Sequence, residues 1–207
     1  MIPARLIRTV PEQSSDEAEA FWQAACELHP DWDHATYRDP INPEWFPLTS
    51  KHWHHAESGA QLAGLVRLEA LWHGGGFYLD SDLELFRPLD FMRQCRMVAT
   101  WEDANTVPDW FLAAEAHHPA VGLCLDLAIA RITNRTNGDL RTGCGAWSTG
   151  PGVTTAILPG RDDVFLLSPN VLAPYHYTEL AREAEPHHLD PLCVGAHRWR
   201  HSWVDLP

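Results

Sequence analysis

Two aspartates one residue apart follow a short apolar run in the segment LWHGGGFYLDSDLELFRPLD, residues 71–90. The run GFYL, residues 76–79, predicts a strand, so Asp80 and Asp82 follow its carboxyl end. Side chains at positions i and i+2 of an extended segment point the same way, so both carboxylates can reach one cation. Glu84 continues this alternation. Carboxylates combined with phosphate oxygens are ligands that suit Mg²⁺ or Mn²⁺.

The same stretch has a simpler interpretation, in which the glycines end a helix and the acidic residues form a solvated turn. Residue types alone leave both interpretations open, because Asp-x-Asp triplets are common by chance. The elements that surround the motif must decide between a ligand site and an ordinary turn.

Apolar strands and amphipathic helices alternate along the chain, and this pattern predicts one α/β domain over residues 1–207, with a mostly parallel sheet flanked by helices. A capping box is expected at Ser14 and Glu17, and a left-handed helix cap at Gly74. Ligands of open α/β sheets bind at the carboxyl ends of strands, where Asp80 and Asp82 are expected. The strands are predicted at 5–10, 33–39, 76–79, 97–101, 111–116, 164–168 and 192–197, and the helices at 14–30, 59–73 and 120–134.

Composition narrows the class of protein. The chain has 207 residues, of which 45% are hydrophobic, and a formal charge of -13, which disfavours nucleic acid and anionic membranes as partners. No stretch approaches the roughly 18–20 apolar residues of a membrane span. The opening MIPARLIRTVPEQSSDE lacks the apolar core of a secretory signal, so a cytoplasmic protein is expected. The five cysteines form no CxxC pair and are expected to be reduced thiols.

Histidines cluster at residues 52–55, 117–118 and 187–188, which raises the question of a zinc site. None of these clusters has the HExxH spacing of a zinc protease, and no third ligand with motif support accompanies them. We therefore expect solvated loop histidines at these positions.

The segment GLVRLEALWHGGGFYLDSDLELFRPLD, residues 64–90, resembles the DXD-containing retaining glycosyltransferases of family 32. This group includes yeast-type α-mannosyltransferases and bacterial capsular sugar transferases, and the chain is more distantly similar to clostridial glucosylating toxins. Three further segments look like family elements and keep the family order. They are IPARLIRTVP at 2–11, STGPGVTTAIL at 148–158 and AHRWRHSW at 196–203.

The resemblance implies a Rossmann-like fold of the GT-A type and a Mn²⁺- or Mg²⁺-dependent transferase. Such an enzyme moves a sugar from a UDP- or GDP-sugar to a hydroxyl of a glycan, a small molecule or a modified polymer, with retention of anomeric configuration. It also implies that Asp80, Asp82 and His197 bind the metal, and that Arg67 and Asp109 lie near the reacting groups. The implied donor contacts are Arg67, Gly75, Gly76, Tyr78, Asp80, Ser81, Asp82, Ser202 and Trp203.

Structural roles remain open for several of these residues. Arg67 could be a buried ion-pair partner, Trp203 a core residue and Asp109 an exposed loop carboxylate. The family's helix Asp, three residues before Arg67, is Gly64 here, which leaves the identity of the sugar open. Two other functions stay open as well: a catalytically inactive sugar-nucleotide-binding module, and a metal-dependent phosphohydrolase, which would need further acidic ligands at strand ends.

Overall fold

Six strands form the central sheet of the computed structural model, which describes residues 1–134 and 145–200. β6 is antiparallel to its neighbours β3 and β5, whereas β1 runs parallel to β2 and β3, and β5 parallel to β7. The predicted α/β class with a mixed, mostly parallel sheet is confirmed. In spatial order the strands are β2 (Asp33–Arg38), β1 (Arg5–Val10), β3 (Gly76–Leu79), β6 (Phe111–Ala114), β5 (Met97–Thr100) and β7 (Phe165–Leu167).

A second, two-stranded sheet joins β4 (Leu83–Leu85) to β8 (Gly195–His197) in antiparallel register, with Leu83 opposite His197. The strand expected at 192–197 is thus shorter than predicted and lies outside the central sheet. β4 was not predicted, because three residues directly after a turn are too few to show a period. The pairing brings β8 beside the residues that follow Asp82.

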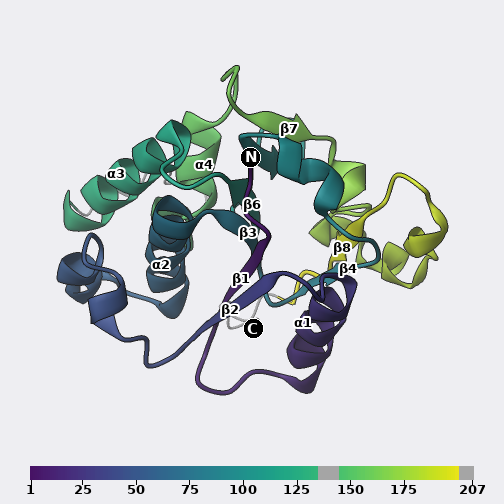
Figure 1. Cartoon of the computed structure of the whole chain (residues 1–207), viewed down its shortest axis with the longest axis horizontal. Coiled ribbons are helices and arrows are strands. Elements are labelled where there is room, and N and C mark those ends of the chain that lie inside the picture. The colour runs from purple at the N-terminus through teal and green to yellow at the C-terminus, as the bar shows by residue number, and fades with distance from the viewer. Residues whose placement is uncertain (135–144, 201–207) are drawn as a thin grey trace.

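Helices cover both faces of the central sheet. Figure 1 shows α2 (Gly59–Gly74), α3 (Pro119–Asn134) and α4 (Pro151–Ile157) on one side, and α1 (Asp16–Leu28) with β4 and β8 on the other. None of the described helices combines the length and apolar character that a membrane span needs. Short 3-10 helices lie at Pro43–Trp45, Ser50–His55, Asp90–Gln94, Gly145–Ser148, Pro169–Val171, Tyr177–Ala184 (η6) and His187–Leu189.

Two predicted helix caps are each wrong by one residue. Ser15, rather than Ser14, caps α1, and its Oγ accepts a hydrogen bond of 3.1 Å from the Ala18 N–H. At the end of α2 the left-handed residue is Gly75, with φ of 61°, while Gly74 is still helical. A Cβ at Gly75 would lie 2.7 Å from the carbonyl oxygen of Ala114, so this turn needs glycine.

The apolar core has one part on each face of the central sheet, because alternate strand residues point to opposite faces. Leu6 and Phe77 belong to the cluster that also contains residues of β4, and Ile7 and Tyr78 to the cluster packed on α2 and α3. The four cysteines in the described part of the chain are free thiols, namely Cys26, Cys95, Cys124 and Cys193.

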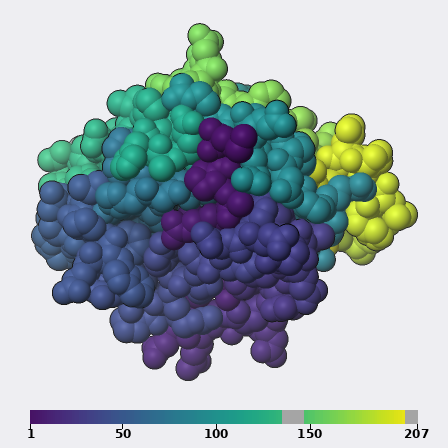
Figure 2. Space-filling model, viewed as in Figure 1, coloured from purple at the N-terminus to yellow at the C-terminus, as the bar shows by residue number. Residues whose placement is uncertain are grey.

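Most of residues 169–200 gather at one side of the molecule. In Figure 1 this green-to-yellow segment forms a lobe beside β4, and Figure 2 shows the yellow part of the lobe projecting on the same side. η6 and β8 both belong to this lobe, so the lobe lies next to the edge of the structure at which the aspartate motif ends.

Candidate functional site

A cavity of about 550 Å³ opens at the edge of the sheet where β1, β2, β3 and β5 end and β6 begins. This edge collects acidic residues that lie far apart in the sequence. Arg67 is the only lysine or arginine among the described lining residues. The acidic lining residues are Asp39, Asp80, Asp82, Glu102 and Asp109, and an apolar wall comprises Val10, Ile41, Ala60, Ala63, Trp147 and Pro151.

Arg67 of α2 holds two of the carboxylates at once. Its Nη2 donates to Asp80 Oδ1 at 2.7 Å and to the Tyr78 hydroxyl at 2.9 Å, and its Nη1 pairs with Asp109 Oδ2. The Tyr78 hydroxyl itself donates to Asp80 Oδ1 at 2.8 Å. The guanidinium lies 4.1 Å from the centroid of the Tyr78 ring, and Arg67 is only 5% exposed. Arg67 therefore combines an ion-pair role with a place in the cavity wall.

Burial sets the electrostatics of this network. Burial raises the pKa of Asp109 to about 6, although the adjacent Arg67 acts to lower it. Burial also acts against the charged form of Arg67, but attraction to Asp109 and Asp80 outweighs it and raises the pKa of the guanidinium. The Asp109 side chain is 14% exposed, so the exposed-loop alternative for this residue is wrong.

Asp82 is held by the segment at the far end of the described chain. The β4–β8 pairing places His197 Nε2 at 3.1 Å from Asp82 Oδ1. Two backbone N–H groups add to this contact: Arg198 donates to the carbonyl oxygen of Asp82 at 2.8 Å, and Arg200 to its Oδ2 at 2.9 Å. The predicted meeting of His197 with the aspartate motif therefore occurs in the structure.

The Asp82–His197 pair favours two charged groups. Burial acts to raise the pKa of Asp82, but attraction to His197 and the Arg200 N–H outweigh it and lower the pKa to about 2. Burial acts to lower the pKa of His197, and attraction to Asp82 outweighs it, so that this pKa is raised. The imidazole stacks on Trp110, with ring centroids 4.6 Å apart, and meets the edge of Trp199.

Asp80, Asp82 and His197 fit a divalent cation. Each offers one ligand atom, and these atoms lie within 4.8 Å of one another. Both ring nitrogens of His197 are buried without an aligned hydrogen-bond partner among the described residues, so one of them can bind a cation once the imidazole has lost its second proton. Carboxylate oxygens with one imidazole suit Mn²⁺, and the carboxylates also suit Mg²⁺.

A second group of three potential ligands lies near this site and comprises Glu102, Asp103 and His176. Glu102 lines the cavity and accepts from the Trp110 indole N–H at 3.3 Å. The carboxylate of Asp103 is engaged in its own turn, where it accepts from the N–H groups of Asn105 and Thr106. The two groups of described ligands include none of the histidines at 52–55, 117–118 and 187–188.

The other predicted donor contacts divide into three sets. Ser81 lines the cavity. Gly75 and Gly76 lie at the amino-terminal end of β3, and Tyr78 is fully buried beneath Arg67, so the structure does not bring these three residues to the cavity. Ser202 and Trp203 lie outside the described residues.

Several residues that line the cavity were not identified from the sequence. Glu102 follows β5 at the same edge as Asp80, and the end of the strand MVAT was the signal that could have identified it. Trp110, Trp147 and Trp199 also line the cavity. Nothing in the sequence distinguishes these three from the other tryptophans, because indoles serve equally in cores and in pockets.

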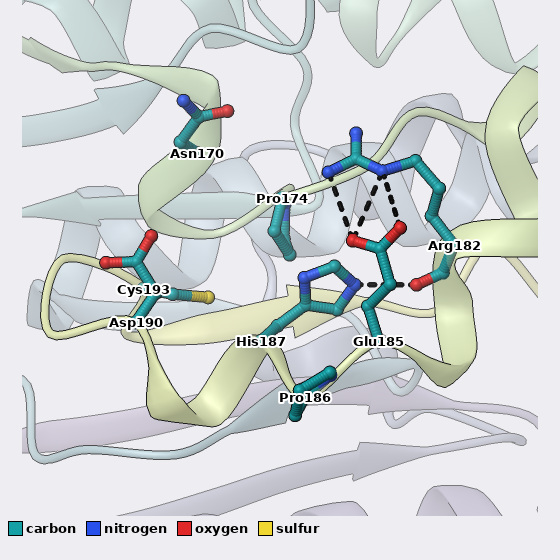
Figure 3. A pocket seen from close by; sticks show the side chains of 8 residues that line it. All are labelled: Asn170, Pro174, Arg182, Glu185, Pro186, His187, Asp190 and Cys193. Carbon is teal, nitrogen blue, oxygen red and sulfur yellow. Dashed lines mark hydrogen bonds and ion pairs between the residues drawn. The ribbon is translucent and has the colours of Figure 1, made fainter.

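A separate cavity of about 340 Å³ lies within the lobe that follows Pro169 (Figure 3). Three of its polar lining residues are already engaged: Arg182 pairs with Glu185 at 3.2 Å, and His187 Nε2 lies 2.7 Å from the Arg182 carbonyl oxygen. Figure 3 shows these groups turned toward one another. The larger cavity is therefore the stronger candidate for a functional site.

Residues 4–106 match the family model described as "Glycosyltransferase sugar-binding region containing DXD motif". The match includes Arg67, Asp80 and Asp82 and ends before Asp109 and His197. No curated protein matches the chain.

Solved structures of glycosyltransferases share the fold. The PaToxG glycosyltransferase aligns with a TM-score of 0.59 at 14% identity, over 75% of this chain and 67% of its own. The ligand-free glycosyltransferase domain of the YGT toxin gives 0.57 at 9% identity, over 80% and 79%. A glycosyltransferase involved in glycosylation of the major capsid of PBCV-1 gives 0.53 at 14% identity, over 94% of both chains. These neighbours confirm the GT-A-type fold, and with the family match they support a sugar-transferase function.

Proposed function

We propose that the chain is a metal-dependent glycosyltransferase that moves a sugar from a UDP- or GDP-sugar to an acceptor hydroxyl with retention of anomeric configuration. One observation carries this proposal: Asp80, Asp82 and His197 gather their ligand atoms within 4.8 Å in the cavity that also contains the Arg67–Asp109 pair. The acceptor would be a glycan, a small molecule or a modified polymer.

The charge of the cavity explains why a cation is needed. Five carboxylates line it, whereas Arg67, the one lysine or arginine among the described lining residues, is already paired with two of them and His197 with a third. A diphosphate entering this cavity would meet a repulsive field. When bound, Mn²⁺ or Mg²⁺ would neutralise the donor phosphates and stabilise the negative charge that grows on the leaving diphosphate.

The residues of the chain would orient the donor around that charge. Asp80 and Asp82 each keep carboxylate lone pairs beyond the contacts described above, so they can bind a cation while remaining positioned. Asp109 is fixed by Arg67 at the cavity wall, from where it could accept hydrogen bonds from sugar hydroxyls. Because Asp109 is held in an ion pair, we favour a front-face reaction in which the leaving phosphate accepts the proton of the acceptor hydroxyl.

Two observations bear on the alternative functions, namely an inactive sugar-nucleotide-binding module and a metal-dependent phosphohydrolase. Gly64 packs so closely that a Cβ there would lie 2.7 Å from the carbonyl oxygen of Thr149, which leaves no space for the family's helix Asp. That loss would suit an inactive binding module. The Glu102–Asp103–His176 group adds acidic ligands near the cavity, as a phosphohydrolase would require.

A thermal-shift screen of UDP-, GDP- and TDP-sugars, each with and without Mn²⁺, tests the proposal. We expect one nucleotide class to raise the melting temperature, and Mn²⁺ to be needed for the full shift. The bound donor is then incubated with candidate acceptors, and the anomeric configuration of the product is read by NMR. Metal-dependent binding without turnover would identify an inactive module, and hydrolysis of the donor to a nucleoside monophosphate and a sugar 1-phosphate would identify a phosphohydrolase.

A further inference from the structure

We propose that Arg200 is a positioning residue for the metal site, because it fastens the backbone that holds Asp82 to Glu17 and Glu183. The inference rests on the proposed metal-dependent function and adds a residue that is not among the cavity-lining residues. Its starting point is the pair of backbone bonds from Arg198 and Arg200 to Asp82.

The backbone around Trp199 is shaped to make both bonds. Trp199 has a φ of 55°, in the left-handed region, and the N–H groups on either side of it, those of Arg198 and Arg200, both bond to Asp82. A bulky residue is strained in this region, so neighbouring contacts must hold the bend. The Trp199 ring is buried, and its Nε1 donates to the Tyr175 carbonyl oxygen at 3.1 Å.

The side chain of Arg200 fixes the outer end of this bend. Its Nε and Nη2 donate to the two oxygens of Glu17, each at 2.8 Å, in a fork geometry. Its Nη1 and Nη2 donate to the two oxygens of Glu183 at 3.1 and 2.5 Å. Glu17 belongs to α1 and Glu183 to η6, so one guanidinium joins two elements that are distant in sequence.

These contacts indicate a role through Asp82 rather than on the donor phosphates. Nη1 of Arg200 also donates to the Arg198 carbonyl oxygen at 3.1 Å, so every nitrogen of the guanidinium is engaged within the protein. The Arg200 side chain is 39% exposed, and ion pairs at such sites contribute little net stability. Groups that orient a metal ligand nevertheless affect metal affinity strongly, by about 10–100-fold when they are removed.

The test compares Arg200→Ala with Arg182→Ala in the full 207-residue chain. Arg182 lies on η6, is 42% exposed and pairs with Glu179 and Glu185, so it matches Arg200 in exposure and partners without a described contact to Asp82. Affinity for Mn²⁺ alone is measured by isothermal titration calorimetry. We expect Arg200→Ala to weaken it about tenfold or more, and Arg182→Ala to leave it within about twofold. Both melting temperatures should stay within about 3 °C of wild type.

Two further variants keep the proposal falsifiable if Arg200→Ala fails to fold. Arg200→Lys retains the charge but cannot bond four carboxylate oxygens, so its Mn²⁺ affinity should fall between those of wild type and Arg200→Ala. The double variant Glu17→Gln with Glu183→Gln should reproduce the loss while Arg200 is kept.

The outcomes separate this inference from the proposed function. Wild-type protein that binds Mn²⁺, together with an Arg200→Ala variant of equal affinity, would overturn the role of Arg200 and leave the metal site standing. Wild-type protein that binds no Mn²⁺ would overturn the metal site and, with it, this role of Arg200.

Discussion

Asp80 and Asp82 are two residues apart, yet the structure holds them in opposite ways. Asp80 Oδ1 accepts from Arg67 and Tyr78, which are 13 and 2 positions away in the chain. Asp82 Oδ2 accepts from Arg200, 118 positions away, and Asp82 Oδ1 faces His197. The first contact set lies within the α2–β3 unit, and the second exists only once β8 has paired with β4.

The two sets of contacts have different roles within one site, one in folding stability and the other in the geometry of the proposed metal ligands. The Asp80 network is buried and includes Arg67, whose loss would leave carboxylates without a partner, so it bears on folding stability. The Asp82 contacts come from a segment near the end of the described chain. The Asp82–His197 pair is largely buried as well, but the ion pair of Arg200 with Glu17, which anchors this segment, is exposed, so changes at Arg200 bear mainly on ligand geometry. Variants in the Asp80 network should therefore lower mainly the free energy of unfolding, and variants at the contacts of Asp82 should lower mainly the metal affinity.

The largest expected effect is on stability, from Arg67→Met. This change leaves Asp80 and Asp109 facing each other without their shared cation, and breaking a buried pair in this way costs about 3–5 kcal/mol. Urea denaturation at pH 8 measures the loss. Arg161→Met is the control, because Arg161 pairs with Asp163 at a partly exposed site, where the cost should stay below about 1 kcal/mol. Equal losses in the two variants would contradict the structural role given to Arg67.

Asp82→Ala should have the next largest effect, and its effect is on metal binding. Removing this ligand should weaken Mn²⁺ affinity by about 100-fold or more, equivalent to about 2.7 kcal/mol. The fold should persist, which circular dichroism can verify. Asp126→Ala, an exposed change on α3, serves as the control. An Asp82→Ala protein that binds Mn²⁺ and the donor as wild type does would exclude Asp82 as a metal ligand.

The same contrast explains what the sequence could predict. Residues 64–90 contain Arg67, most of α2, β3 and both aspartates, so local periodicity and motif spacing sufficed to place Asp80 and Asp82 at the end of a strand, whereas Arg67 was found through the family resemblance. The three consecutive glycines could not show which of them adopt a positive φ, and the left-handed cap is Gly75 rather than the predicted Gly74.

The contacts of Asp82 were harder to predict. His197 was found only through the family resemblance, because pairing between β4 and β8 leaves no local pattern. The Arg200 ion pairs have no sequence signature at all, since Glu17 and Glu183 resemble any other exposed helical glutamates. Trp199 was available in the sequence, but its left-handed φ depends on surrounding contacts rather than on its residue type.

Asp109 and Asp82 should make opposite contributions to the pH dependence of the unfolding free energy. The folded pKa of Asp109 is raised to about 6 by burial, so its contribution is full below the unfolded value of about 4 and is lost as pH rises through 6. The folded pKa of Asp82 is lowered to about 2, so its contribution is full above about 4 and is lost as pH falls toward 2.

Asp109→Asn tests the first of these contributions. Wild type should lose about 2 kcal/mol more unfolding free energy than Asp109→Asn when the pH is raised from 4.5 to 7.5, because asparagine has no proton to lose. Chemical denaturation of both proteins at the two pH values gives this difference. Identical pH profiles would show that Asp109 is not held with a raised pKa.

The smallest effect is expected from Tyr78→Phe, and it sharpens the comparison most directly. Two donors reach Asp80 Oδ1, and this variant removes the tyrosine hydroxyl while the Arg67 Nη2 remains. It also leaves Thr9 Oγ1 without the partner that it has at 2.7 Å. The unfolding free energy should therefore fall by about 1 kcal/mol.

Mn²⁺ affinity should change by less than about twofold in Tyr78→Phe, because Arg67 alone still positions Asp80. Tyr37→Phe is the matched control. Tyr37 lies on β2, its hydroxyl accepts from Arg5 Nη2 at 3.0 Å, and it is not among the cavity-lining residues. The two variants should lose similar stability and keep similar metal affinity. A loss of about tenfold in Mn²⁺ affinity confined to Tyr78→Phe would mean that Asp80 depends on a single donor, as Asp82 depends on its distant segment, and the contrast between the two aspartates would then fail.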